Sequence, residues 1–421
     1  MRLLIVLLFL LPLHVLALSP TREAAVNIIT YWPNGFRVDE TPQGHRVRRL
    51  LGKIKALGVD TVIFNFRARM VGGTSSDIQS VVAIQDQPEE ERLVVETSRY
   101  AQSIGLQVAF RPILLVVGPH GEFPYVENGF TWWHGNIRPT NITTWFQSFF
   151  EYHNRYMRLA RTVNAVWYSV GAEMHSMTSG LGSRNPISRF GYPLQWVQLL
   201  TQARAILGPQ VKITYGVNYT DQYVLEDGIR TWGGELEQWR HDLTFLPKNP
   251  QEEQHQENMK ALWRSLDFAG LDYYRALGAS KTKYPANYDE LVAVLSSMSE
   301  GYALSLDQTL AQISAATDTN HPLAIQEVGY RSVEKCFVSP YLYEDDHTPL
   351  NYQHQAAAWD ALLASLWNDQ RPWMRGIGLW QVLVDDDSDL ETNGGFSPLG
   401  KEPAEQVLKK YFQPVLFDPI Q

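Results

Sequence analysis

The chain has 421 residues and a formal net charge of −9, from 36 Lys and Arg against 45 Asp and Glu. Hydrophobic residues make up 44% of the chain and charged residues 19%, which excludes an intrinsically disordered protein. The acidic balance argues against a dedicated nucleic-acid binder, because phosphate backbones require clustered Lys and Arg. The single cysteine, Cys336, can form no disulfide within the chain and leaves no cysteine-rich metal site.

The first 17 residues have the pattern of a secretory signal peptide. Arg2 supplies the positive charge, an apolar run follows at residues 3–13, and Ala17 ends a small-residue cleavage site. The apolar run is well short of the roughly 20 residues that span a bilayer. We therefore expect a signal peptide at 1–17 and a secreted or periplasmic mature chain at 18–421, with no membrane contact after cleavage.

Eight short apolar runs, rich in β-branched and aromatic residues, alternate along the chain with segments of helical period. This alternation predicts βαβ crossovers and a parallel sheet, and eight units suggest an α/β fold closed into a single (β/α)8 TIM barrel. The alternative is an open doubly wound sheet, which normally has a glycine-rich phosphate turn after an early strand. Neither of the first two strands leads into such a turn. The strands are expected at Val26–Tyr31, Thr61–Phe66, Gln107–Ile113, Asn164–Val170, Lys212–Val217, Phe268–Tyr273, Leu323–Gln326 and Gly376–Trp380.

Four segments between these strands place apolar residues on one helical face. We expect Gly58 and Gly208 to end two of these helices and Asn141 to cap another. The long polar connection Tyr219–Glu257 is a candidate part of a cleft wall, because loops of this length are usually functional or mobile. The helical faces are expected at Val47–Leu57, Trp145–Leu159, Leu194–Leu207 and Ala356–Trp367.

Two glutamates stand at strand ends, where a (β/α)8 barrel carries its chemistry. Glu173 follows the fourth strand and Glu327 follows the seventh, and these strands face each other across the barrel mouth. Two carboxyls about 5–5.5 Å apart are the geometry of retaining glycoside hydrolysis, in which one is protonated and the other ionised. Burial and a negative neighbour raise the pKa of the acid, whereas hydrogen-bond donors keep the nucleophile charged. Each glutamate alone fits an ion pair equally well, but the pair predicts a catalytic site.

Five stretches in a consistent order carry a family resemblance: Trp133–Pro139, Gly171–Met174, Asp267–Tyr274, Gln326–Tyr330 and Phe396–Ala404. Each is short, but together they span most of the mature chain. Their order and spacing resemble glycoside hydrolase family 113, β-mannanases within clan A of the retaining (β/α)8 enzymes.

The resemblance implies roles for individual residues. Glu173 would be the acid/base and Glu327 the nucleophile. Tyr274 would hydrogen-bond the nucleophile, and Trp380 would form the floor of the −1 sugar site. The chain departs from the clan at Ala172, where many members have an asparagine that binds the sugar 2-hydroxyl.

Aromatic side chains in a cleft stack on the apolar faces of sugars. Trp133 and His134 follow the third strand, where such a platform belongs, and are predicted to bind substrate. Arg67 follows the second strand and is a candidate to bind at the mouth and hold the nucleophile ionised. Residues for which a structural role is the alternative are Tyr31, Trp32, Trp132, Arg67, Arg69 and Arg111.

Other chemistries have weaker signals. The acidic run Asp385–Glu391 lacks the spacing of a calcium loop and is interpreted as a solvated loop. The 11 histidines include no zinc-hydrolase motif, and no Gly-x-Ser-x-Gly elbow is present. We therefore expect no metal and no cofactor. Asn141 and Asn218 match the glycosylation sequon, which matters only in a eukaryotic secretory pathway.

The sequence thus predicts a secreted, metal-independent retaining glycoside hydrolase that acts on a β-linked polysaccharide or oligosaccharide. A β-mannan-type substrate is favoured by the resemblance, and a glucan or chitosan-like polymer is the alternative. A non-catalytic carbohydrate-binding barrel is the rival class. Ala172 favours that rival, whereas retention of both Glu173 and Glu327 argues against it. Endo or exo action and the oligomeric state stay open.

Overall fold

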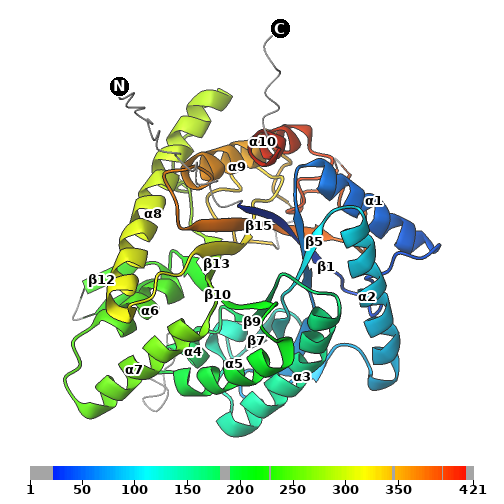
Figure 1. The fold of residues 1–421 in the computed structure, drawn as a ribbon. Helices are drawn as coiled ribbons and strands as arrows, with labels where there is room; N and C mark the ends of the chain where they lie inside the picture. Colours follow the sequence, from blue (N-terminus) through cyan, green and yellow to red (C-terminus); the bar gives the residue numbers. More distant parts are fainter. Residues whose placement is uncertain (1–21, 181–189, 227–228, 344–346, 391, 414–421) are drawn as a thin grey trace, which may run out of the picture.

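Eight parallel strands form a closed barrel in the computed structural model, which describes residues 22–180, 190–226, 229–343, 347–390 and 392–413. The strands lie at the centre and the helices surround them (Figure 1). The (β/α)8 fold and all eight predicted strands are confirmed, with ends that shift by a few residues. The barrel strands are β1 (Glu23–Ile29), β2 (Thr61–Asn65), β5 (Gln107–Phe110), β9 (Trp167–Ala172), β10 (Lys212–Thr220), β13 (Ala269–Tyr274), β14 (Leu323–Val328) and β15 (Met374–Leu383).

The helices pack their apolar faces against the outside of the barrel. Within the described ranges, two 3₁₀ turns, η1 (Ile84–Asp86) and η2 (His134–Asn136), accompany the α-helices. The α-helices are α1 (Pro42–Ala56), α2 (Gln87–Ser103), α3 (Ile142–Thr162), α4 (His175–Thr178), α5 (Pro193–Leu207), α6 (Gly234–Thr244), α7 (Pro250–Ser265), α8 (Tyr288–Thr317), α9 (Tyr352–Leu366) and α10 (Glu402–Phe412).

The predicted helix signals are confirmed, with one face rotated. The Asn141 side chain caps α3 by accepting from the Thr144 N–H at 3.0 Å, as its position predicts. Gly208 follows α5 with φ of +73°, a conformation that favours glycine. The buried face of α5 is centred on Trp196 and Leu200, whereas Leu194 is 46% exposed. Burying Trp196, the largest apolar side chain of the helix, contributes to this orientation.

Two barrel strands continue beyond the barrel mouth as a separate small sheet. Pro112, which has no N–H to donate, separates β5 from β6 (Ile113–Val117), so the predicted third strand is two strands. In the same way, β2 is followed by β3 (Arg67–Val71), which pairs in parallel with β6 and antiparallel with β4 (Gln79–Ser80). The segment that follows β6 ends in a hairpin of β7 (Tyr125–Glu127) and β8 (Phe130–Trp132).

The described residues of the connection predicted at Tyr219–Glu257 include strands and helices, which corrects its interpretation as a long loop. It contains a hairpin of β11 (Tyr223–Glu226) and β12 (Ile229–Trp232), then α6 and the start of α7. Trp239 in α6 is fully buried, whereas Trp232 in the hairpin is 51% exposed. This connection therefore adds both a core element and an exposed aromatic surface beside β10.

Small residues in the barrel make room for polar side chains from neighbouring strands. A Cβ on Gly270 would lie 1.9 Å from the Gln326 amide nitrogen, and one on Gly216 would lie 2.9 Å from a carboxylate oxygen of Asp272. The Gln326 amide crosses the interior to the Thr214 hydroxyl at 2.9 Å. The mouth half of the barrel is consequently polar, in contrast to the apolar layers that normally fill such barrels.

The first and last strands close the barrel, since β1 pairs with both β15 and β2. The acidic loop that follows β15 packs on α1. Asp389 accepts from Lys53 at 2.6 Å and from Arg49 at 3.1 Å, and Asp387 accepts from Arg49 at 2.9 Å. The acidic run thus pairs with a basic helix face and is not merely solvated.

The predicted signal peptide, residues 1–17, lies outside the described residues. Within the part of the chain that the structure describes, every helix is too short or too polar to cross a membrane.

Candidate active site

The backbone at the end of β9 aims Glu173 into the barrel mouth. Glu173 has φ of +54°, a left-handed conformation that is uncommon outside glycine and often marks a functional residue. Two hydrogen bonds hold this bend. The Glu173 N–H donates to the Gly216 carbonyl at 2.8 Å, and the Met174 N–H donates to the Tyr215 hydroxyl at 2.6 Å.

Two side chains hold the carboxylate of Glu173, whose side chain is 14% exposed. The Asn218 amide, at the end of β10, donates to one oxygen at 2.5 Å. His134 Nε2 lies 3.3 Å from the other oxygen. The predicted site residue His134 therefore contacts the predicted acid/base directly.

A buried guanidinium and a tyrosine hold Glu327 at the end of β14. The Tyr274 hydroxyl donates to one oxygen of Glu327 at 2.6 Å, as the resemblance implies. Arg111 Nη2 lies 2.7 Å from the other oxygen and donates to Asp272 at 2.6 Å. Arg111 is 1% exposed and also donates to Asn65 at 3.1 Å, so its position is fixed from three sides.

The two glutamates interact electrostatically. Burial raises the pKa of Glu327, and the charge of Glu173 adds to this rise against the lowering by Arg111 and Tyr274. Burial also acts to raise the pKa of Glu173, but donors from His134 and Asn218 outweigh it and leave that pKa lowered. In the ligand-free site these directions are the reverse of those expected for an acid at Glu173. The cause is that Arg111 shares its single charge between the carboxylates of Asp272 and Glu327. Glu173, in contrast, has both Asn218 and His134 as partners.

Aromatic rings flank the pair. The Arg111 guanidinium lies 5.8 Å from the centre of the Trp380 ring, which places Trp380 beside the Glu327 cluster. Trp133 packs edge-on against His134 at 5.0 Å and against His175 at 4.9 Å. Burial lowers the pKa of His175 to about 4, so this ring is neutral at neutral pH. Trp133 therefore packs on the His134 that contacts Glu173, and Trp380 lies near the Arg111 that contacts Glu327.

Arg67 contacts Tyr31 and not the nucleophile candidate Glu327, which corrects the role expected for it. It lies over the Tyr31 ring at 4.7 Å, and the cation beside Glu327 is Arg111. Tyr31 is 50% exposed, so this stacked pair forms part of the accessible rim. Trp132 is buried and its indole donates to Glu127 at 2.9 Å, which identifies it as a residue of the loop core.

A network behind Glu173 is not predicted from the sequence. Asn218 matches a sequon, but its position at the end of the fifth barrel strand is also a signal for the site. Glu235 of α6 accepts from the Asn218 backbone N–H at 3.1 Å and from the Tyr215 hydroxyl at 3.1 Å. Burial raises the pKa of Glu235 to about 7. Nothing in the local sequence links α6 to the mouth, because the contact depends on the barrel closing first.

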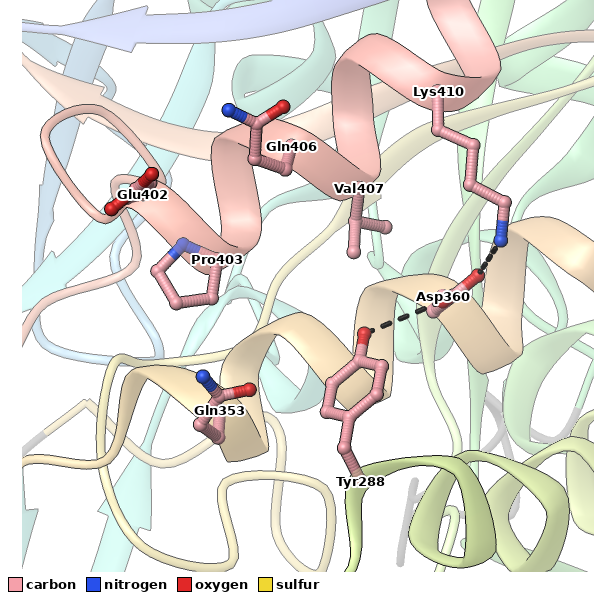
Figure 2. A pocket seen from close by; sticks show the side chains of 8 residues that line it. All are labelled: Tyr288, Gln353, Asp360, Glu402, Pro403, Gln406, Val407 and Lys410. Atoms are coloured by element: carbon pink, nitrogen blue, oxygen red, sulfur yellow. Dashed lines mark hydrogen bonds and ion pairs between the residues drawn. The ribbon is translucent and has the colours of Figure 1, made fainter.

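A hollow of about 440 Å³ lies away from this site, between α8, α9 and α10 (Figure 2). Three of its polar groups pair with one another, since Asp360 accepts from Lys410 at 2.9 Å and from Tyr288 at 3.3 Å. In the described ranges, no three His, Cys, Asp or Glu side chains are grouped as a metal ion requires.

A closed parallel barrel with two interacting carboxyls at the ends of its fourth and seventh strands is the architecture of retaining glycoside hydrolases. The model of Glycoside Hydrolase Family 113 matches residues 35–184, a span that includes Glu173 and ends before Glu327. The chain is thus similar to glycoside hydrolase family 113 over residues 35–184, and its barrel has the (β/α)8 fold.

Solved structures support the same fold. A GH113 β-1,4-mannanase in a complex has 19% identity and a TM-score of 0.56, covering 93% of this chain and 99% of that one. A GH113 β-mannanase from Alicyclobacillus acidocaldarius, in complex with ManMIm, has 16% identity, a TM-score of 0.60 and coverage of 94% and 98%. A GH5_18 variant from Streptomyces cattleya, in complex with Manβ1-4GlcNAc, has 14% identity, a TM-score of 0.52 and coverage of 95% and 82%. Curated protein sequences give no match.

Proposed function

We propose that this protein is a retaining β-glycoside hydrolase that cleaves a β-mannan-type polysaccharide with Glu173 and Glu327. The observation that carries the proposal is the pair of largely buried carboxyls at the ends of β9 and β14, each held by its own donors, with the charge of Glu173 raising the pKa of Glu327. Two of the structural neighbours are β-mannanases, and this supports the choice of sugar.

The first half of the reaction transfers the sugar to the protein. A Glu327 oxygen attacks the anomeric carbon while the bond to the leaving oxygen breaks, and Glu173 gives its proton to that oxygen. Arg111 and Tyr274 position the attacking carboxylate through their contacts at 2.7 and 2.6 Å. In the second half, Glu173 takes a proton from water, the water oxygen attacks the anomeric carbon, and Glu327 leaves as a carboxylate.

His134 and Asn218 affect whether Glu173 carries the proton that it has to donate. Since the donors from His134 and Asn218 favour ionised Glu173, a bound sugar has to raise the pKa of this carboxyl by excluding water and bringing the leaving oxygen to it. Loss of water makes an ionised carboxylate less favourable and therefore raises its pKa. Substrate binding thus prepares Glu173 as the acid.

Asn218 supplies an amide beside the acid/base where Ala172 has none. Ala172 has no amide for a sugar hydroxyl, but the Asn218 amide from the adjacent strand contacts the same carboxylate, Glu173. The chain therefore keeps an amide beside the acid/base. This weakens the case for a non-catalytic barrel, for which Ala172 was the main argument.

A fluorinated mannoside that traps the covalent intermediate tests the proposal. We expect one label per chain, on Glu327, by peptide mass spectrometry, and release of reducing ends from β-mannan. Glu173→Ala and Glu327→Ala should each lower kcat by several orders of magnitude with little change in Tm, whereas the exposed control Glu253→Ala should retain activity. A label on Glu173 would reverse the roles. Unlabelled, inactive protein that still retards on mannan gels would support the binding barrel, and activity on only a glucan or chitosan-like polymer would replace the substrate.

We also propose that the protein is exported. The support is the charged start, the apolar run at 3–13 and the small residues before position 18. Expression with and without residues 1–17, followed by N-terminal sequencing of protein outside the cytoplasm, tests this. Full-length protein retained inside the cell would contradict it.

A further inference from the structure

Two loops from opposite sides of the barrel meet above the mouth. In the barrel order β1-β15-β14-β13-β10-β9-β5-β2, the strands β5 and β14 are four places apart in both directions, so they lie diametrically opposite. Phe123 follows β5 through its extension β6, and Tyr343 follows β14. Their rings are stacked with centres 6.4 Å apart and an angle of 18° between the planes.

The strand extension raises Phe123 above the barrel. β6 has five residues and rises by about 16 Å at about 3.3 Å per residue, supported by its pairing with β3. A tight turn follows, in which the Gly118 N–H donates to the Glu122 carbonyl and the Gly121 N–H donates to the Gly118 carbonyl, both at 2.9 Å. Phe123 comes directly after this turn, so the strand pairing and the turn hydrogen bonds fix the position of its backbone.

The opposite loop is also anchored. After β14, a bridge pairs Val333 with Leu350, and the Leu277 N–H donates to the Phe337 carbonyl at 2.8 Å. Phe337 is fully buried against Tyr284, with ring centres 4.8 Å apart. Tyr343 projects from this fixed base and is 52% exposed, while Phe123 is 50% exposed.

A contact between loops of diametrically opposite strands spans the mouth. We propose that the stacked rings of Phe123 and Tyr343 form an aromatic bridge over the cleft, beneath which a sugar chain passes to reach Glu173 and Glu327. This inference rests on the proposed function. The bridge makes the cleft a covered passage, so it admits an unbranched chain and excludes one with sugar side groups.

Exposed aromatic residues mark the two open ends of this passage. Tyr31 and Trp32 follow β1 and are 50% and 68% exposed. Tyr223 and Trp232 belong to the hairpin after β10, pack edge-on at 5.5 Å, and are 42% and 51% exposed. β1 and β10 are also four places apart in both directions, and they lie on either side of the line from β5 to β14. A sugar chain that passes under the bridge would stack on these aromatic rings at both ends.

The first test compares an unbranched β-mannan with a galactosyl-branched β-mannan. Phe123→Ala and Tyr343→Ala should each raise kcat/KM on the branched polymer about tenfold relative to the unbranched one, while hydrolysis of a small aryl mannoside stays unchanged. Tyr341→Ala is the matched control, because Tyr341 is on the same loop and is 57% exposed. An unchanged ratio in active enzyme would overturn the bridge and leave the proposed function intact.

The second test measures the geometry independently of activity. In a Phe123→Cys/Tyr343→Cys variant, a short bis-maleimide should join the two loops within one chain, and the single-cysteine variants should not become cross-linked. The native Cys336 does not interfere, because it is buried and burial raises the pKa of its thiol. The cross-linked enzyme should keep its activity on unbranched mannan. Absence of a cross-link, or loss of that activity on cross-linking, would overturn the inference. A double-cysteine variant that becomes cross-linked, together with wild-type protein that cleaves no glycan, would instead remove the proposed function and, with it, the passage.

Discussion

Replacing Tyr274 with phenylalanine removes a single hydroxyl from the group that holds Glu327. That hydroxyl donates to the carboxylate at 2.6 Å and is buried with it, so the bond is charge-assisted. Hydrogen bonds to charged groups contribute about 1.5–3 kcal/mol, which corresponds to a fall of about 10- to 150-fold in kcat/KM for Tyr274→Phe. The ring remains in place, so Tm should change little.

Tyr274→Phe should also shift the pH dependence of kcat/KM in a defined direction. The Tyr274 hydroxyl favours the ionised form of Glu327, so removing it raises the pKa of this carboxyl further. The acid limb of the kcat/KM profile should therefore move to higher pH. Tyr273→Phe is the control, because its hydroxyl is equally buried and no hydrogen bond to it is found among the described residues. If Tyr274→Phe and Tyr273→Phe gave the same rates and pH profiles, the role assigned to the hydroxyl would be refuted.

Two further predictions concern buried charges. Burial raises the pKa of Glu23 from 4.5 to about 7, so its contribution to stability is lost as pH rises through this range, by up to about 3 kcal/mol. Glu23→Gln should flatten the pH dependence of the free energy of unfolding, measured with urea at about pH 5 and about pH 9; an unchanged slope would contradict it. Arg111→Met should destabilise the fold by about 3–5 kcal/mol, because Asp272 loses its partner. Adding Asp272→Asn should restore Tm without restoring activity, and recovery of activity would show that Arg111 is not needed at Glu327.

The barrel was predictable because its strands are buried on both sides. Such strands appear in sequence as continuous apolar runs, and eight of them suffice to indicate closure. The hairpin after β10 was missed, although the Asp-Gly pair at 227–228 is the sequence signal of a two-residue hairpin loop. The rotated face of α5 was missed because Leu194 and Trp196 both satisfy a helical period, and only packing chooses between them.

The site was predictable in part. Glu173 and Glu327 were found because strand ends are known positions for chemistry, and His134 because it lies in the loop after the third strand. Arg111 was left undecided between roles, since a cation inside an apolar strand reveals its partners only when strands from the far side of the barrel approach. Asn218 was not recognised for the same reason: its contact with Glu173 depends on the register between β9 and β10.

The closure of β1 on β15 has a consequence for biosynthesis. One edge of β1 pairs with β2, which follows soon after it, but the other edge waits for residues Met374–Leu383, near the end of the chain. Ribosomes make chains from the N-terminus, so the ring cannot be completed until almost the entire polypeptide has emerged. Contacts this distant in sequence slow folding. The nascent protein therefore keeps one edge of β1 unpaired until β15 has been synthesised.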